Sequence, residues 1–308
     1  MAPRTTRSVS RAARLAEAVA TGPLGALSHD ELGVIFDGLA DPLQPELAVA
    51  LSSTCLGLRT PLRAALQVLK GRHGRAKALC RKLGGCCAGM RLASVLVREE
   101  EDVTAYDMAT IGMVLRTNGL PQLVKVRLNE CSFGDAGMLA LFEGMGHGAA
   151  PSLTKVSLNC NDIGPAGAEA LAAALQRGAM PNLQGLFIGD NPLGDAGAAA
   201  LATHLRKLPG LCMLELDNSG IGDEGVASLL DHLGKDDFKN LKQLWLDGSD
   251  EGTMTSKGLA TLVSVLNSGA MPKLEELILS RDGGEEEEAL AEAGRARNVT
   301  ITFWDRWE

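Results

Sequence analysis

One apolar frame recurs along most of this chain and limits what the chain can fold into. The pattern Leu-x-x-apolar-x-apolar occurs seven times, and successive leading leucines lie 31, 30, 30, 28, 30 and 33 residues apart. The leading residues are Leu92, Leu123, Leu153, Leu183, Leu211, Leu241 and Leu274. A period of this length is typical of stacked supersecondary units, because one such unit cannot bury its apolar face alone. The sequence therefore predicts a solenoid of about seven units.

Each unit is predicted to contain one strand and one helix. Apolar residues alternate within the frame, as they do in a strand with one buried face. A glycine-rich motif follows in four units, at 133–137, 163–167, 193–197 and 221–225. Asp135, Asp195 and Asp223 lie in this motif where a helix begins, and we expect each to cap its own helix. The predicted fold class is α/β, a solenoid with a curved parallel sheet inside and helices outside.

Two units carry the repeat most completely. Leu153–Asn161 and Leu183–Asn191 follow the pattern Leu-x-x-apolar-x-apolar-x-x-Asn, which resembles the leucine-rich repeat. The long period and the full helix in each unit resemble those of the ribonuclease-inhibitor-like subfamily. This resemblance covers residues 90–308, which include a C-terminal cap. In the other units we expect small groups at the asparagine position to bond the neighbouring turn's backbone. These residues are Cys131, Ser219, Ser249 and Asp282.

Aromatic side chains are scarce, at 3% of the chain. Alanine-rich helices can lie close to the sheet, so we expect the repeat cores to exclude aromatic rings. An aromatic residue in the middle of a frame would then lie on the open side of the sheet and serve as an interface anchor. Phe187 and Trp245 have this position.

The concave face is the predicted partner-binding surface. The residue between the last two apolar positions of each frame points to this face, because side chains alternate along a strand. These residues are Leu96, Arg127, Ser157, Phe187, Glu215, Trp245 and Ile278. Asp190, Asp217 and Asp247 add acidic groups, and residues 91–308 carry 18 basic and 32 acidic side chains. We expect a protein partner of basic and apolar character, and no nucleic acid.

Residues 24–60 depart from the repeat and predict a small helical module. The sequence L-x-x-D-E-L-x-x-I-F-x-x-L, followed by L-S-x-x-C-x-x-L-R, is similar to the F-box. F-box modules dock substrate receptors on the adaptor of a cullin-RING ubiquitin ligase. Ser28 replaces the usual proline and Leu58 the usual tryptophan. The resemblance implies adaptor-binding or core roles for Leu27, Leu32, Ile35, Phe36 and Leu39. The alternative is that these helices only cap the first repeat.

Two basic segments flank this module. Residues 1–23 are rich in Arg, Ser and Thr, and we expect a disordered leader, with organellar import as the alternative. Residues 61–89 are predicted to form a basic connecting helix. Residues 1–90 carry 12 basic and 6 acidic side chains, but no aromatic residues interleave with the cations of the connecting helix. We therefore expect a solvated connector, and neither nucleic-acid nor membrane binding.

No motif in the sequence predicts catalysis. The seven cysteines have no C-x-x-C spacing, so we expect neither a zinc module nor a disulfide framework. The adjacent Cys86 and Cys87 are interpreted as packing residues. We find no secretory signal and no apolar run of transmembrane length, and expect a cytoplasmic or nuclear protein. The expectation is a non-enzyme without metal or cofactor.

The functional hypothesis combines the two resemblances. We expect an F-box-like substrate-recognition subunit that binds an adaptor through residues 24–60 and a protein through the concave face. A stand-alone interaction scaffold or inhibitor is the alternative, and a small-GTPase regulator is a further one. Fold alone does not choose among these functions.

Overall fold

The chain divides into two compact units. The computed structural model describes residues 35–36, 39–53, 62–83, 86–91, 93–99, 103–117, 120–246, 254–280 and 285–304. The N-terminal unit contains residues 1–92 and 113–120, and the repeat unit contains residues 93–112 and 121–308. We describe each unit by itself.

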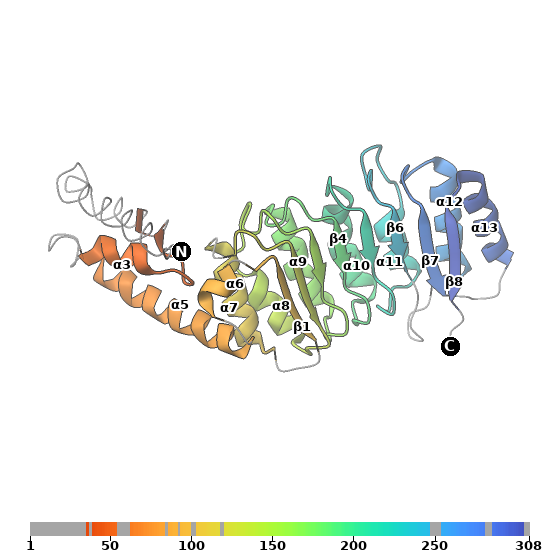
Figure 1. The fold of residues 1–308 in the computed structure, drawn as a ribbon. Coiled ribbons are helices and arrows are strands. Elements are labelled where there is room, and N and C mark those ends of the chain that lie inside the picture. The colour runs from red at the N-terminus through yellow and green to blue at the C-terminus, as the bar shows by residue number, and fades with distance from the viewer. Residues whose placement is uncertain are drawn as a thin grey trace, which may run out of the picture. The chain divides into compact units, whose positions relative to one another are not determined.

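The repeat unit contains one eight-stranded sheet, whose strands are all parallel and follow one another in sequence order (Figure 1). The strands are β1 (Val95–Glu99), β2 (Lys125–Asn129), β3 (Lys155–Ser157), β4 (Gly185–Phe187), β5 (Met213–Glu215), β6 (Gln243–Trp245), β7 (Glu276–Ser280) and β8 (Thr300–Trp304). This order confirms the predicted α/β solenoid, because each strand pairs with those of the preceding and following repeats.

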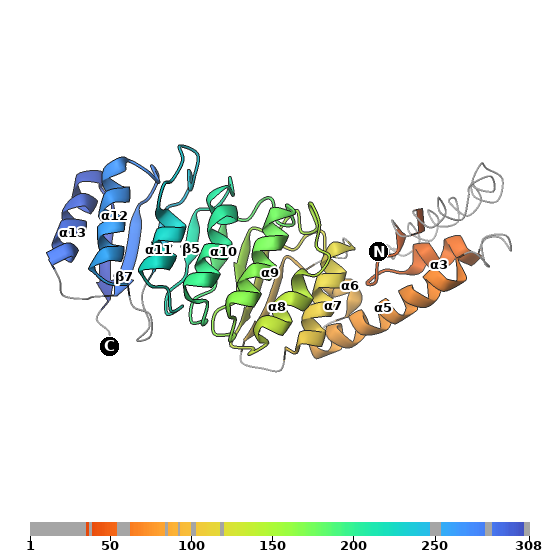
Figure 2. The same ribbon diagram turned by 180° about the vertical axis from the view of Figure 1, so that it is seen from behind.

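The helices of the repeat unit alternate with its strands and lie along one side of the sheet (Figure 2). They are α7 (Ala105–Arg116), α8 (Gly134–Phe142), α9 (Pro165–Gln176), α10 (Gly194–Arg206), α11 (Asp223–Leu230), α12 (Ser256–Ser268) and α13 (Glu285–Arg297). The last four residues of α7 cluster with the N-terminal unit. No described helix of the repeat unit lies over the other face of the sheet (Figure 1).

Aliphatic side chains fill the space between sheet and helices. Leu186 and Leu214 from the strands and Leu201 from α10 are at most 1% exposed. Alanines such as Ala168 and Ala198 are also fully buried, which lets neighbouring helices approach closely.

The expectation that repeat cores exclude aromatic rings is wrong. Phe133, Phe142 and Phe238 are all buried in the repeat unit. They lie at the turn before α8, at the end of α8 and in the loop after α11, at the two ends of the helical layer. Rings are therefore accommodated at or beyond the ends of the helices.

The glycine-rich motifs cap helices, but across repeats. Asp195 Oδ1 accepts hydrogen bonds from Gly222 N at 2.7 Å and Gly225 N at 2.9 Å, at the start of α11 in the next repeat. Asp135 and Asp223 bond the starts of α9 and α12 in the same way. The prediction that each aspartate caps its own helix is therefore wrong. Each carboxylate lies in the first turn of its own helix and reaches the free N–H groups of its neighbour.

Glycine allows this approach of carboxylate and helix. A Cβ at Gly225 would lie 2.6 Å from Asp195 Oδ1 and 2.7 Å from Ile221 Cγ2. At the equivalent position of α9, a Cβ at Gly167 would lie 2.7 Å from Asp135 Oδ1. The second glycine of the motif is therefore needed for contact between repeats.

Asparagines join the turns after the strands. Asn191 is 1% exposed and uses all of its amide: Oδ1 accepts two backbone N–H groups, and Nδ2 donates to three carbonyls. The partners are Asn161 N, Ile163 N, Leu158 O, Ile188 O and Gly189 O. Asn161 makes a similar but smaller set: Oδ1 accepts one backbone N–H, from Cys131, and Nδ2 donates to three carbonyls.

The shorter side chains at this position reach less far. Cys131 Sγ donates to Asn129 O and Ser219 Oγ to Asp217 O, each within its own turn. We expected these groups to bond the neighbouring turn, whereas these two bonds are local, because Ser and Cys are one atom shorter than Asn. Ser249 and Asp282 lie outside the described residues.

The N-terminal unit is helical. It contains α3 (Glu46–Ser53), α5 (Arg63–Lys82) and α6 (Cys87–Arg91), and α5 continues through two glycines without a break. A small apolar cluster joins Phe36, Ala40 and Ala48 to Leu62, directly before α5, and to Leu69 within it. None of the described helices is long and apolar enough to cross a membrane.

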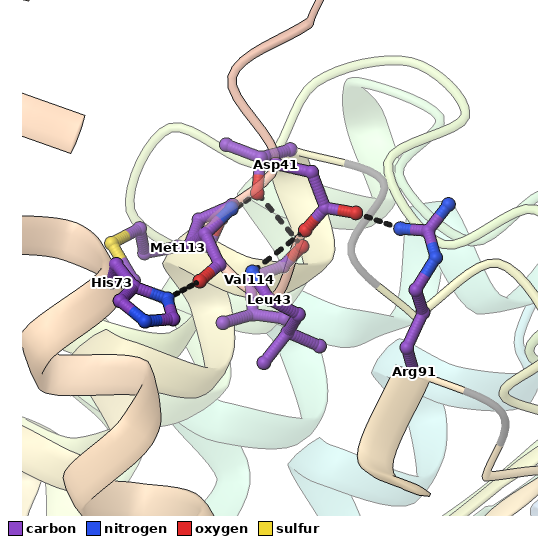
Figure 3. A network of polar contacts seen from close by, with 8 residues as sticks. Asp41, Leu43, His73, Arg91, Met113 and Val114 are labelled. Carbon is purple, nitrogen blue, oxygen red and sulfur yellow. Dashed lines mark hydrogen bonds and ion pairs between the residues drawn. The ribbon is translucent and has the colours of Figure 1, made fainter. Parts of the chain in front are cut away.

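Polar contacts hold the turn before α3 (Figure 3). Asp41 accepts a hydrogen bond from Leu43 N at 2.8 Å and forms an ion pair with Arg91. His73 Nδ1 lies 2.7 Å from Pro42 O, so the middle of α5 also contacts this turn. The turn is therefore tied to α5 and to α6 by side chains from each.

Candidate functional site

The open face of the sheet carries two columns of side chains. In each strand the second residue points to the helices, so the first and third residues point away from them. The pairing register aligns one column that contains Val97, Arg127, Ser157, Phe187, Glu215, Trp245, Ile278 and Thr302. We keep the name concave face for this surface. The six residues from Arg127 to Ile278 that were predicted for it are neighbours in this column.

The first repeat was placed one residue too early. Leu96 pairs with the core residue Val126 and is 6% exposed, whereas Val95 and Val97 are 45% and 48% exposed. The prediction that Leu96 lies on the concave face is therefore wrong, and Val97 has that position. A shift of one residue moves every side chain of a strand to the other face. Three consecutive apolar residues at Val95–Val97 left this alternation ambiguous in the sequence.

The predicted aromatic anchors are half-buried. Phe187 and Trp245 lie two strands apart, with Glu215 between them on β5. A Cβ at Gly185 would lie 2.8 Å from the Phe187 ring, so this glycine leaves the space in which the ring rests on the sheet. Ile278 is only 5% exposed and offers little surface, contrary to its predicted role.

Glu215 is the half-buried carboxylate of the column. Burial raises its pKa, the hydrogen bond from Asn159 Nδ2 to its Oε1 at 2.5 Å opposes this, and the charge of Asp190 raises it further. Adjacent strands are about 4.8 Å apart, so the Phe187 and Trp245 backbones flank Glu215 at that spacing on either side. The carboxylate therefore lies within a partly desolvated part of the face.

Polar groups at the ends of the strands connect neighbouring repeats. Asn129 Oδ1 accepts hydrogen bonds from Ser157 Oγ at 2.7 Å and Asn159 N at 3.1 Å. Asn159 Oδ1 in turn accepts from Gly189 N at 3.1 Å. A Cβ at Gly189 would lie 2.2 Å from Asp217 Oδ1, so the Asp217 carboxylate covers this glycine. These contacts fix the polar edge of the concave face.

A second cluster of acidic side chains, Glu130, Asp190 and Asp217, lies around Cys160 in the turns that follow the strands. Burial raises the pKa of the Cys160 thiol to about 11, and the charges and hydrogen bond of Asp190 and the charges of Glu130 and Asp217 contribute. Asn218 Nδ2 donates to Asp190 Oδ1 at 3.1 Å. Of the predicted acidic residues, Asp190 and Asp217 therefore lie close together. Asp247 is outside the described residues.

The sequence reasoning missed the second column of the concave face. It contains Val95, Lys125, Lys155, Gly185, Met213, Gln243, Glu276 and Thr300. The signal was the same alternation, since a residue two positions earlier in a strand points to the same side. This column adds Lys125 and Lys155 to Arg127 on β2 and β3, and it adds Glu276 on β7.

The concave face is consequently divided by charge. Its basic half contains Lys125, Arg127 and Lys155, on β2 and β3. Its acidic half contains Glu215 and Glu276 on β5 and β7, and Asp190 and Asp217 lie in the turns after β4 and β5. The Phe187 ring on β4 lies between the two halves.

Replacing Glu215 by glutamine should change how stability depends on pH. The folded-state pKa of Glu215 is raised, so its contribution to stability is present below the unfolded-state pKa of about 4.3 and is lost as pH rises through the folded-state value. Glu215→Gln keeps an acceptor for Asn159 and should gain stability relative to wild type as pH rises from 4. Urea unfolding between pH 3.5 and 8 measures this. A difference independent of pH would contradict it.

The predicted adaptor-binding residues fall in the N-terminal unit. Phe36 is 0% exposed at the centre of the apolar cluster, so it supports the fold and presents no docking surface. Ile35 and Leu39 are half-buried against the same cluster. Leu27 and Leu32 lie outside the described residues.

The side chains of the concave face are suited to binding a partner. The described residues include no group of three or more His, Cys, Asp or Glu side chains that could hold a metal ion. On the helical side of the repeat unit, an open groove of about 670 Å³ lies between α8 and α9, lined by Ala136, Leu139, Ala140, Ala170 and Arg177 among others. The concave face, with its ring pair and divided charge, is the more distinctive surface.

Comparisons with known proteins support the repeat. A family model described as "Leucine Rich repeat" matches residues 149–172 and 179–202, so the chain contains leucine-rich repeats. No curated protein sequence matches the chain significantly. A solved structure titled "Leiomodin-1 Actin-Binding Site 2 (ABS2)" is similar at 16% identity and a TM-score of 0.42, covering 53% of this chain and 88% of that one.

Proposed function

We propose that this chain is a non-enzymatic protein-binding module that uses the concave face of its leucine-rich repeats. One observation carries the proposal: Phe187 and Trp245 are partly exposed on the helix-free side of the sheet, in the same column as a half-buried carboxylate. Aromatic residues of this kind dominate the binding energy of protein interfaces. Leucine-rich repeats suggest the same general role.

The divided charge refines the kind of partner. Acidic side chains of a partner would lie opposite Lys125, Arg127 and Lys155, and basic side chains opposite Glu215 and Glu276. Electrostatic complementarity of this kind sets the orientation of a complex. The sequence predicted a partner of basic and apolar character. The basic half of the face additionally predicts that this partner has an acidic segment.

Replacing the two rings tests the proposal. Phe187→Ala and Trp245→Ala should each weaken partner binding by about 2 kcal/mol, roughly 30-fold in Kd. The partner is first identified by crosslinking to full-length protein in cells, and Kd is then measured by calorimetry. Tyr106→Ala is the matched control, because Tyr106 is 59% exposed on α7, away from the concave face. Equal effects of all three substitutions would contradict the proposal.

Stability measurements keep the test interpretable. Both rings are partly exposed, so each substitution should lower the unfolding free energy by less than about 2 kcal/mol. If the two variants unfold, the rings belong to the core and the concave face is not the binding surface.

The finer proposal is an F-box-like substrate receptor of the ribonuclease-inhibitor-like type, acting in the cytoplasm or nucleus. The repeat of about 30 residues with a helix in each unit supports the subfamily. The helical unit around Phe36 supports the F-box-like part, with Ile35 and Leu39 only half-buried. In this role the N-terminal unit binds the ligase adaptor while the concave face selects the protein to be ubiquitylated.

A binding assay with purified components tests the adaptor role. Full-length protein should co-elute with the purified adaptor–cullin complex in size-exclusion chromatography, and Leu39→Asp should abolish co-elution. Exposed Val68→Asp on α5 is the control for a new charge in the same unit. If no complex forms at 20-fold excess adaptor, the adaptor role is wrong and the stand-alone scaffold remains. The proposal that the concave face binds a protein does not depend on this result.

A further inference from the structure

Three cysteines meet at the junction of α5 and α6 in the N-terminal unit. Cys80 lies in the last turn of α5, Cys86 directly precedes α6 and Cys87 begins it. Cys80 Sγ donates a hydrogen bond to Cys87 Sγ at 3.6 Å and lies 3.6 Å from Met90 Sδ. The sequence placed Cys86 and Cys87 side by side as packing residues, and the fold adds a third thiol to them.

We propose that Cys80 and Cys87 form a reversible disulfide bond with each other. The oxidant is a low-molecular-weight disulfide such as oxidised glutathione, which reacts by thiol–disulfide exchange. The two sulfurs are already in van der Waals contact, and a bond of about 2.05 Å requires them to approach by about 1.6 Å. Six residues separate the two cysteines, so the bond closes a short loop that includes Gly84 and Gly85.

Burial and protonation assign different roles to the two thiols. Cys80 is 1% exposed, whereas Cys87 is half-buried and Cys86 exposed. Burial raises the pKa of Cys80 to about 12, and the hydrogen bond and charge of Cys87 add to this. Cys80 therefore stays protonated and donates to Cys87, and Cys87 is the thiol that reacts with an incoming oxidant.

The reaction balances as two thiol–disulfide exchanges. The Cys87 thiolate attacks one sulfur of oxidised glutathione, forms a mixed disulfide and releases one glutathione thiolate. Cys80 then gives its proton to a thiolate or to water and attacks Cys87 Sγ, which releases the second glutathione. The two protein thiols lose two electrons in total, and one oxidised glutathione becomes two reduced molecules.

Peptide mapping can identify the bond directly. Full-length protein is incubated with oxidised glutathione, free thiols are alkylated, and the protein is digested with trypsin without reduction. Cleavage after Lys77, Arg81, Lys82 and Arg91 separates Cys80 from the other two cysteines. We expect residues 78–81 to be recovered linked to residues 83–91, and the link to disappear after treatment with dithiothreitol.

Single substitutions distinguish the possible pairs. Cys87→Ser and Cys80→Ser should each abolish the linked peptides, whereas Cys86→Ser should leave their yield within about twofold of wild type. Cys212→Ser is the control for a half-buried cysteine elsewhere in the chain. Loss of the link in Cys86→Ser but not in Cys87→Ser would overturn the assignment. A bond between Cys86 and Cys87, seen as residues 83–91 two mass units lighter and unlinked, would overturn it as well.

Discussion

Asn191→Ala should lower the unfolding free energy of the repeat unit by about 4 kcal/mol, because it removes a hydrogen-bond partner from five buried backbone groups. The Asn191 side chain is 1% exposed and joins two N–H groups and three carbonyl oxygens of consecutive turns. Water cannot replace these bonds while the turns remain packed. Urea unfolding followed by circular dichroism measures the effect as a lower midpoint.

Ser219 provides a matched comparison for this effect. It occupies the same repeat position and is 0% exposed, but its hydroxyl donates to Asp217 O within its own turn. Ser219→Ala should therefore cost about 1 kcal/mol. If the two alanine variants lose the same stability, the bonds between turns contribute little and burial alone sets the cost at this position.

Asp195→Ala is expected to have the second-largest effect, a loss of about 3 kcal/mol. The substitution removes the acceptor for Gly222 N and Gly225 N, which are both buried at the start of α11. It also removes a negative charge from a helix N-terminus, where such a charge is stabilising. Amide hydrogen exchange should show Gly225 exchanging at least tenfold faster, while urea unfolding reports the global loss.

The control separates a specific cap from a general charge effect. Glu224 also lies in the first turn of α11, but its side chain is exposed. Glu224→Ala should change stability by less than about 0.5 kcal/mol. Asp195→Asn keeps an acceptor oxygen and should lose less than Asp195→Ala. Equal losses in Asp195→Ala and Glu224→Ala would show that the bonds across repeats are not the cause.

Much of the fold follows from local patterns. The frame around Leu183, Leu186 and Ile188 predicts a strand with one buried face, and all three side chains are fully buried. The glycine and proline after α12 predict its end, and Gly269 has the left-handed conformation, with φ of +79°, that such an end requires. These features depend on residues close in sequence, so one unit is enough to recognise them.

Contacts between repeats were harder to anticipate. Asp195 was predicted to cap α10 because it lies in that helix's first turn, but its partners are 27 and 30 residues later. Leu96 was placed on the wrong face because its neighbours on both sides are also apolar. In both cases the local pattern was compatible with two arrangements, capping of either helix by Asp195 and burial or exposure of Leu96. Packing against the next repeat determines which arrangement forms.

The repeat, its strand-and-helix content and the column from Arg127 to Ile278 were predictable from period and alternation, because both can be read along the linear sequence. Which side chains from different elements meet depends on how the elements pack in the folded chain. This packing placed Lys125 and Lys155 beside Arg127, put Glu215 between two aromatic residues, and brought Cys80 to Cys87. Stacking brings residues about 30 positions apart to within about 5 Å, and a linear pattern does not specify the side-chain contacts that result.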